Sequence, residues 1–152
     1  MSGFPPGISL PDATATAAIL AFLTGLFALR VAGQAIVVRW APPWLPPMTE
    51  WYSGLLPYPR LLATQLVVLG VTASVVVGLA LGWPAITDPR PALGTLLLLI
   101  AWPYGLSMPV RYGVRMWRHP EARWTGRTIP IVFHVVLAMW LFVLGSYLRP
   151  VA

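Results

Sequence analysis

PVRYGVRMWRHPEARWTGRTIP, residues 109–130, is the stretch of the chain in which charge is most concentrated. A long apolar run flanks it on each side, and a single acid, Glu121, lies within it. Its arginines are Arg111, Arg115, Arg118, Arg123 and Arg127. Dense positive charge between two apolar segments is typical of a cytoplasmic loop in a membrane protein. We therefore place the other segments of the chain relative to this loop.

The composition indicates that lipid is the main solvent of this chain. Of its 152 residues, 58% are hydrophobic and 9% are charged, whereas a soluble domain carries about 25% charged residues. The chain contains no Cys and no Lys, which excludes disulfides, thiolate metal sites, thioether haem attachment and lysine Schiff bases. We attribute the net charge of +6 to loops held at an anionic leaflet, and expect no nucleic-acid partner.

Four apolar segments are long enough to cross a bilayer, which takes about 20 residues each. We therefore expect an all-α integral membrane bundle of four transmembrane helices that forms a single domain over residues 1–152. Asp12 is a suitable N-cap for the first helix, and Pro103 and Pro109 predict a kink in the third. The predicted helices cover residues 13–40, 61–83, 92–117 and 128–148.

The distribution of arginine predicts the orientation. Arg39, Arg60 and the five arginines of residues 109–130 flank two predicted loops, 41–60 and 111–127, whereas only Arg90 and Arg149 lie on the opposite side. The positive-inside rule then places loops 41–60 and 111–127 in the cytoplasm and both termini on the outer side. We expect the plasma membrane, the inner membrane of a bacterium, as the location.

Small residues recur at helical spacing in the first two predicted helices. Because lipid solvates apolar side chains as well as a protein core does, helix association in membranes depends on close packing. Both stripes therefore predict contact with another helix, in this chain or in a partner. The stripes are Ala17, Ala21, Gly25, Ala28 and Ala32 in the first helix, and Gly70, Ser74, Gly78 and Gly82 in the second.

Arg30 is the most informative single residue, because it lies nine residues inside Arg39 and therefore roughly 13 Å deeper along a helix. An arginine at this depth costs about 2.5–3.5 kcal/mol on insertion scales and is a functional residue by default. No acid falls within a predicted helix, so its partner is Gln34, Gln65, a backbone carbonyl, Glu50, a lipid phosphate or an anionic ligand. The structural alternative is snorkelling towards the cytoplasmic interface.

Two further features suggest ligands. Arg111, Arg115 and Arg118 share one helix face and suit a phospholipid head group, as well as setting the orientation. His134, among aliphatic residues, is a candidate ligand of a haem iron or a chlorophyll magnesium, or a hydrogen-bonding partner of another helix. The sequence requires no cofactor, and no metal cluster, carboxylate pair or nucleophile triad can be assembled from it.

The first half of the chain resembles the DoxX-like small four-helix membrane proteins. The resemblance rests on Arg30-Val31-Ala32-Gly33 and on a loop that ends Leu56-Pro57-Tyr58-Pro59 before a glycine-bearing helix. That family often carries an acid in the second helix, where this chain has Gln65 as the nearest polar residue. The resemblance implies an accessory membrane subunit linked to redox enzymes, and of the functional residues only Arg30 is carried over.

These observations favour a non-catalytic function. We expect an accessory or structural subunit of a larger membrane complex, with an integral membrane protein or a second copy as partner and anionic lipids around it. The alternative is a binder or carrier of a hydrophobic or anionic ligand, such as a quinone, pigment, haem or lipid, at Arg30, Gln34, Gln65 and His134. No catalytic residue is assigned.

Overall fold

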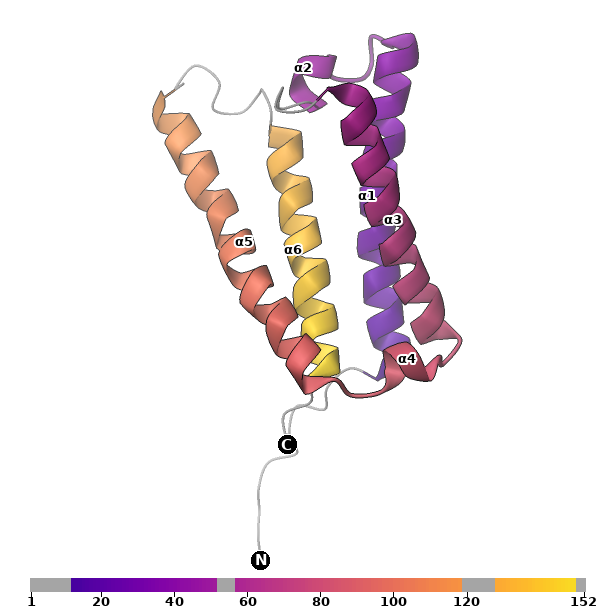
Figure 1. The fold of residues 1–152 in the computed structure, drawn as a ribbon. Coiled ribbons are helices and arrows are strands. Elements are labelled where there is room, and N and C mark those ends of the chain that lie inside the picture. The colour runs from indigo at the N-terminus through magenta and orange to yellow at the C-terminus, as the bar shows by residue number, and fades with distance from the viewer. Residues whose placement is uncertain (1–11, 52–56, 119–127, 150–152) are drawn as a thin grey trace, which may run out of the picture.

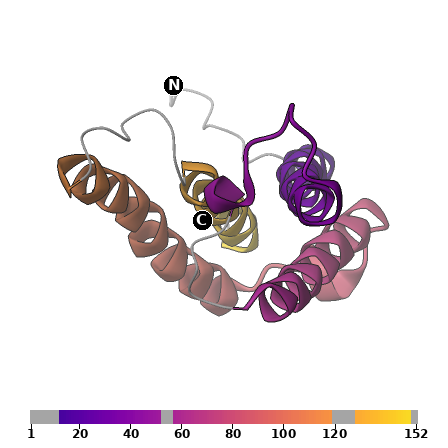
Figure 2. The ribbon, with the colours of Figure 1, turned by 90° about the horizontal axis from the view of Figure 1, so that it is seen from above.

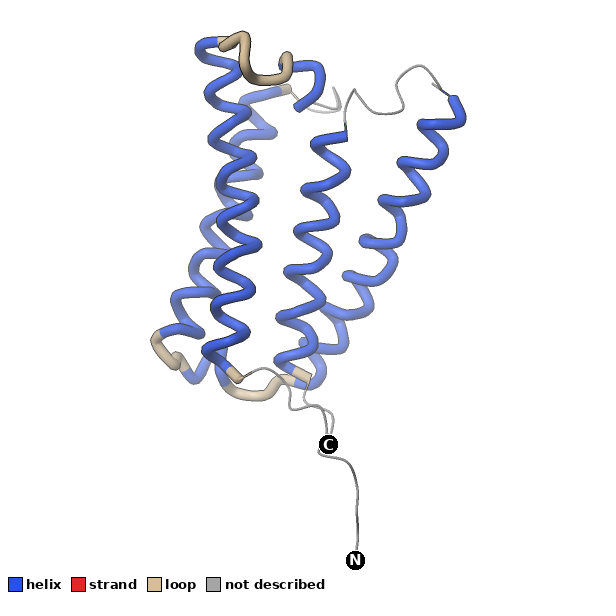
Figure 3. The backbone as a smooth tube through the Cα atoms, turned by 180° about the vertical axis from the view of Figure 1, so that it is seen from behind, coloured by secondary structure: helices blue, strands red, loops and turns tan. Residues whose placement is uncertain are grey.

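The computed structural model describes residues 12–51, 57–118 and 128–149. Within these ranges the chain contains α-helices and short loops but no strand (Figure 3). The helices are α1 (Ala13–Trp40), α2 (Met48–Trp51), α3 (Tyr58–Ala80), α4 (Pro84–Thr87), α5 (Pro91–Arg118) and α6 (Thr128–Leu148). The predictions for Glu121, Arg123 and Arg127 lie outside the described residues.

Four of these helices, α1, α3, α5 and α6, are long and apolar enough to cross a membrane. The all-α prediction with four membrane-spanning helices is therefore confirmed. The start of α1 and the end of α6 lie at the same end of the bundle (Figure 1). The predicted bounds 13–40 and 128–148 coincide with α1 and α6, and the prediction 92–117 differs from α5 by one residue at each end.

Helix α3 was predicted to cover residues 61–83. In the structure it begins and ends three residues earlier, at Tyr58 and Ala80. The helix begins at Tyr58 because Pro59 falls in its first turn, where a missing N–H removes no helical hydrogen bond. It ends at Ala80 because Gly82 takes a positive φ of 67°, a left-handed conformation that a helix cannot contain.

Helix α6 lies at the centre of the bundle, between α5 on one side and the α1/α3 pair on the other (Figures 1 and 2). It packs extensively on both α5 and α1, while α3 packs mainly on α1. The core accordingly joins α1 to α6, with Leu79 of α3 at its edge. Inside it, the buried indole Nε1 of Trp140 donates a hydrogen bond to Thr24 Oγ1 at 3.1 Å.

Helices α5 and α6 approach most closely at the end of the bundle that holds α4. A Cβ built on Gly94 would lie 2.7 Å from the backbone oxygen of Gly145, and one built on Gly145 would lie 3.1 Å from the oxygen of Gly94. The backbone N–H of Arg90 also donates to the carbonyl of Leu148 at 2.9 Å. Towards its other end α5 leans away from the bundle (Figure 1). It is one continuous helix through Pro103 and Pro109, and the kink stays a prediction.

The small-residue stripes pack within the described chain only in part: Ala17 of the first stripe belongs to the core, and contact of the exposed members with a partner stays a prediction. In α1, Ala21 and Gly25 are exposed, and the buried face carries larger side chains such as Leu20 and Phe27. That face is buried because the larger side chains fill the space against α6 with more dispersion contacts. In α3, Gly70 and Ser74 are exposed, whereas Gly78 is covered by Trp83 and Ile86 at the start of the following turn.

Candidate functional site

Three polar side chains are buried near one another inside the otherwise apolar bundle. Arg30 and Gln34 lie one turn apart on α1, and Gln65 faces them from α3. Their exposed fractions are 6%, 0% and 5%. We refer to Arg30, Gln34 and Gln65 as the polar cluster. The structure thus brings together three of the four residues that the sequence singled out as ligand candidates.

Hydrogen bonds join the polar cluster only in part. Gln65 Nε2 donates to Gln34 Oε1 at 3.0 Å, and Arg30 Nη2 donates to the backbone oxygen of Trp51 at 3.3 Å. The Arg30 guanidinium carbon also lies 5.6 Å from the centre of the Phe133 ring, within range of a cation–π contact. In residues 12–51, 57–118 and 128–149, Arg30 forms no ion pair with an acid.

Three buried polar atoms of the cluster have no hydrogen-bond partner among the described residues: Arg30 Nε, Gln34 Nε2 and Gln65 Oε1. Leaving such a group unpaired away from water costs about 1–3 kcal/mol each, and more for a charged group. Reversing both amides would exchange the roles of the two glutamines and still leave one NH₂ group and one carbonyl oxygen unpaired. The polar cluster therefore contains buried donors and a buried acceptor without partners among the described residues.

The short helix α2 covers this cluster at the arginine-rich end of the bundle. Its Trp51 ring packs directly on α1, because a Cβ built on Gly33 would lie 2.7 Å from the ring. The Trp51 indole Nε1 donates to the backbone oxygen of Pro46 at 3.0 Å. Sequence reasoning missed Trp51 and Phe133 as neighbours of Arg30. In the sequence, only Gly33 could have indicated the position of Trp51, because a glycine three residues after Arg30 leaves room for a large ring on the same helix face.

His134 faces α5 from α6. Its Nδ1 lies at hydrogen-bonding distance from the carbonyl oxygen of Pro130, and its ring lies 5.8 Å from the ring of Tyr104, centre to centre. When Nδ1 donates to that carbonyl, Nε2 keeps a lone pair that a ligand can use. No group of three His, Cys, Asp or Glu residues within the described parts of the chain is placed to hold a metal ion.

An apolar cleft of about 400 Å³ opens between α3, α5 and α6. It exists because α5 packs on α6 and α3 packs on α1, so the two outer helices stand apart. The lining of the cleft begins about one turn along the helices from Gln65 and Phe133. On α3, Val68 and Thr72 of its lining follow Gln65 by one and two turns, and on α6 Leu137 follows Phe133 by one turn. Tyr104 lines the α5 wall.

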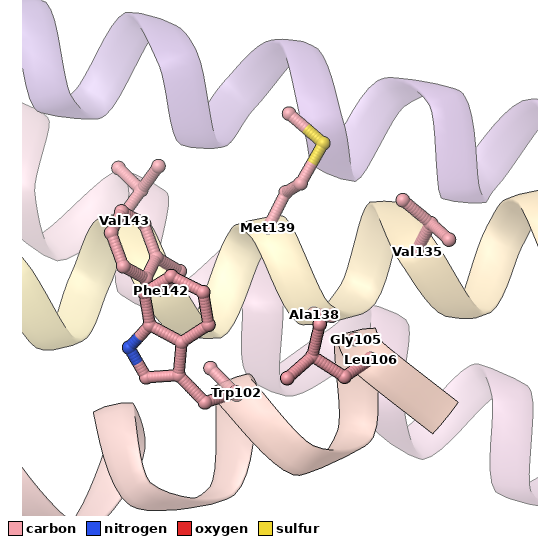
Figure 4. A pocket seen from close by; sticks show the side chains of 9 residues that line it. Trp102, Gly105, Leu106, Val135, Ala138, Met139, Phe142 and Val143 are labelled. Atoms are coloured by element: carbon pink, nitrogen blue, oxygen red, sulfur yellow. The ribbon is translucent and has the colours of Figure 1, made fainter. Parts of the chain in front are cut away.

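A second apolar groove, of about 310 Å³, lies between α5 and α6 on a different side of α6 (Figure 4). Trp102 of α5 and Phe142 of α6 meet there edge to face, with ring centroids 5.5 Å apart and planes at 83°. Gly105 and Ala138 form its floor. Among the described residues, the buried polar atoms that lack a hydrogen bond all belong to the polar cluster, and none belongs to the lining of this groove. We therefore assign the site to the polar cluster and the first cleft.

The basic residues gather at the end of the bundle that α2 covers. Arg111 and Arg118 are exposed and Arg115 is half-buried on the last turns of α5. Arg39 at the end of α1 and Arg60 in the first turn of α3 lie at the same end (Figure 1). The arginine asymmetry read from the sequence is therefore also an asymmetry of the folded bundle.

The chain matches no protein-family model, no curated protein and no solved structure. The resemblance to DoxX-like proteins stays a prediction. The function must therefore be inferred from the geometry of the polar cluster and the cleft.

Proposed function

We propose that this protein binds a lipid-soluble molecule whose polar head group occupies the cluster of Arg30, Gln34 and Gln65. The observation that carries this proposal is the set of three buried polar atoms left without hydrogen bonds among the described residues. Buried polar groups in folded proteins are paired with few exceptions. Three exceptions on two packed helices, two of them on a hydrogen-bonded pair of glutamines and the third one turn away on α1, favour a ligand over an incidental result of packing.

The burial of Arg30 argues against a purely snorkelling side chain. A snorkelling arginine holds its guanidinium in water or among lipid head groups. Here the side chain is only 6% exposed, and it turns towards the Trp51 carbonyl and the Phe133 ring. Arg30 also lies ten residues before the end of α1 at Trp40, which is about 15 Å along the helix axis. Its charge is therefore held inside the bundle.

The cleft between α3, α5 and α6 suits the apolar part of such a ligand. Apart from Thr72 and Tyr104, its lining consists of aliphatic side chains and Trp140. A ligand with its head group at Gln65 would extend along Val68 and Thr72, away from the arginine-rich end. Sites of this kind combine a mostly apolar surface with a few polar groups that fix the orientation.

We infer that the arginine-rich end faces the cytoplasm of a bacterial cell and that the protein resides in the plasma membrane. Five described arginines support this side, Arg39 and Arg60 together with the three of α5, against Arg90 and Arg149 at the other end. The ligand head group would then lie in the cytoplasmic half of the bilayer.

Replacement of a single glutamine tests the proposal. Gln65→Leu removes both amide contacts at similar volume, so the ligand should be lost while the helices still assemble. Wild type and variant are purified from native membranes in lipid nanodiscs, and co-purified small molecules are extracted and compared by mass spectrometry. Ser74→Ala is the control, because Ser74 lies on α3 outside the cleft, is exposed, and bonds only to Gly70 in its own helix. The same molecules recovered from all three proteins would refute the proposal.

A second candidate function, an accessory subunit of a membrane complex, is supported by the exposed glycines. A Cβ built on Gly25 of α1 or on Gly70 of α3 would meet no neighbouring element within 4 Å, so their small size serves no contact within the described bundle. Glycine in a helix costs about 1 kcal/mol relative to Ala, and small residues let a second protein's helix approach closely. Gly25→Leu and Gly70→Leu should then lose a protein that co-purifies with wild type. If wild type purifies alone in mild detergent, this candidate fails.

A further inference from the structure

We propose that the ligand is an anionic amphiphile, with an oxyanion head group held by Arg30 and a single apolar chain in the cleft between α3, α5 and α6. This inference rests on the proposed binding function and adds the chemical class of the ligand and its route from the bilayer. Three observations carry it: the charge balance of the polar cluster, the arginines that continue the walls of the cleft, and the separation of α3 from α5.

The charge balance of the polar cluster favours an anion. Arg30 is a buried cation that forms no ion pair with the acids of the described chain. A charge held in a medium of low dielectric constant is stabilised most by an opposite charge in contact with it. The unpaired donors, Arg30 Nε and Gln34 Nε2, suit the two oxygens of a carboxylate or two oxygens of a phosphate. A hydroxyl on the head group would satisfy the remaining acceptor, Gln65 Oε1.

Four arginines lie on the same helix faces as residues that line the cleft, nearer to the membrane surface. On α5, Tyr104 lines the cleft, and Arg111, Arg115 and Arg118 follow it by 7, 11 and 14 residues, on the same helix face. On α3, Val67 and Val71 line the cleft, and Arg60 precedes Val67 by seven residues on that face.

We call Arg60, Arg111, Arg115 and Arg118 the basic rim. Arg111 lies about 10 Å along the helix from Tyr104, so the basic rim is at head-group depth when the cleft is within the apolar core of the bilayer. An anion at the bilayer surface gains about 1 kcal/mol of attraction for each arginine nearby. The rim therefore concentrates anionic amphiphiles at the mouth of the cleft.

The separation of α3 and α5 provides the route. The cleft separates α3 from α5, and α5 leans away from the bundle towards its arginine-rich end (Figure 1), so the two helix backbones diverge in that direction. The polar cluster is covered from the end of the bundle by α2, through Trp51 and Gly33. A ligand thus reaches Arg30 from the side, between α3 and α5, with its apolar chain already in lipid.

The experiment compares three probes that share one chain and differ in head group: oleate, oleyl phosphate and oleyl alcohol. The full-length protein is placed in nanodiscs of zwitterionic phosphatidylcholine, and each affinity is measured by titration. We expect both anions to bind wild type about tenfold or more tightly than the alcohol, because hydrogen bonds to charged groups are the stronger ones. The ratio between oleate and oleyl phosphate tells a carboxylate ligand from a phosphate ligand.

Variants locate the binding. Arg30→Gln should bring the anions to within about twofold of the alcohol, since the charge contact is lost. Arg30→Lys should retain the preference for anions at lower affinity, because an ammonium lacks the planar fork of a guanidinium. Arg90→Gln, at the opposite end of the bundle, is the matched control and should bind as wild type does. Arg111→Gln with Arg115→Gln should weaken the dependence of anion binding on salt concentration.

The outcomes separate this inference from the proposed function. If oleyl alcohol binds as tightly as the anions and Gln65→Leu abolishes the binding, the ligand is neutral and only the charge inference is overturned. If none of the probes binds, or if Arg30→Gln and Gln65→Leu bind all three as wild type does, both fail. Should Arg30→Gln not fold, the comparison of the three probes on wild type still decides the question of charge. An unchanged salt dependence in the double variant would overturn the role of the basic rim.

Discussion

Helices α5 and α6 are so close at Gly94 and Gly145 that the methyl group added by Gly94→Ala should destabilise the bundle. In Gly94→Ala, the new Cβ would lie 2.7 Å from the Gly145 oxygen and 2.8 Å from the backbone nitrogen of Arg149. Both of these atoms belong to the backbone of α6 and its end, so a side-chain rotation cannot relieve the contact. Overpacking of this kind typically costs about 1–3 kcal/mol. Gly70→Ala provides the control, because a Cβ there meets no neighbouring element within 4 Å.

Gly→Ala also raises helix propensity, by up to about 1 kcal/mol at Gly70 in the interior of α3 and by no more than that at Gly94 in the first turn of α5. A lower stability of Gly94→Ala therefore reports mainly the contact between α5 and α6. We expect Gly94→Ala to be less stable than Gly70→Ala by about 1–3 kcal/mol. The assay is reversible unfolding in mixed detergent micelles, followed by circular dichroism. For a chain of 152 residues, each kcal/mol also lowers the melting temperature by about 2–4 °C on the scale of soluble proteins. Equal stabilities of the two variants would refute the close approach of α5 and α6.

Two further predictions concern the hydrogen bond between α1 and α6 and the orientation of the chain in the membrane. Thr24→Val should destabilise the bundle by about 1–3 kcal/mol, because it leaves the buried Trp140 indole N–H without its acceptor. Ser74→Ala, which removes an exposed hydroxyl bonded to its own helix, should change the unfolding free energy by less than about 0.5 kcal/mol. If both changes cost the same, the hydrogen bond between α1 and α6 does not contribute. Reporter fusions after Pro46 should be cytoplasmic and those after Thr87 external, as the arginine asymmetry requires. The reverse pattern would show that the positive-inside rule does not set the orientation of this protein.

The positions of the membrane-spanning helices were predictable from the sequence because they depend on local properties. The length of an apolar run, the N-cap at Asp12 and the proline near the start of α6 act within one helix, and α1 and α6 were placed correctly. The end of α3 was missed because it depends on the left-handed backbone conformation of Gly82, which is one of several conformations open to glycine.

The candidate site was predictable only in part. Arg30 and the two glutamines stand out in the sequence because polar side chains are rare in a membrane-spanning helix. Their neighbours do not stand out. Trp51 and Phe133 are ordinary apolar residues of a membrane protein, and they reach Arg30 only through the placement of α2 and α6. His134 has the same chemical distinction as Arg30, yet the fold turns it towards Tyr104 on α5.

The sequence by itself determined that the chain is helical, which segments are long enough to cross a bilayer, and at which end most of the arginines gather. Only the tertiary structure decided which face of each helix packs. A helix that is apolar all round carries no periodic signal for its buried face, so the exposed Gly25 and the closely packed Gly94 look alike in the sequence. The difference between them is the position of a neighbouring backbone. That position is set by dispersion contacts summed over the whole bundle, which no local pattern records.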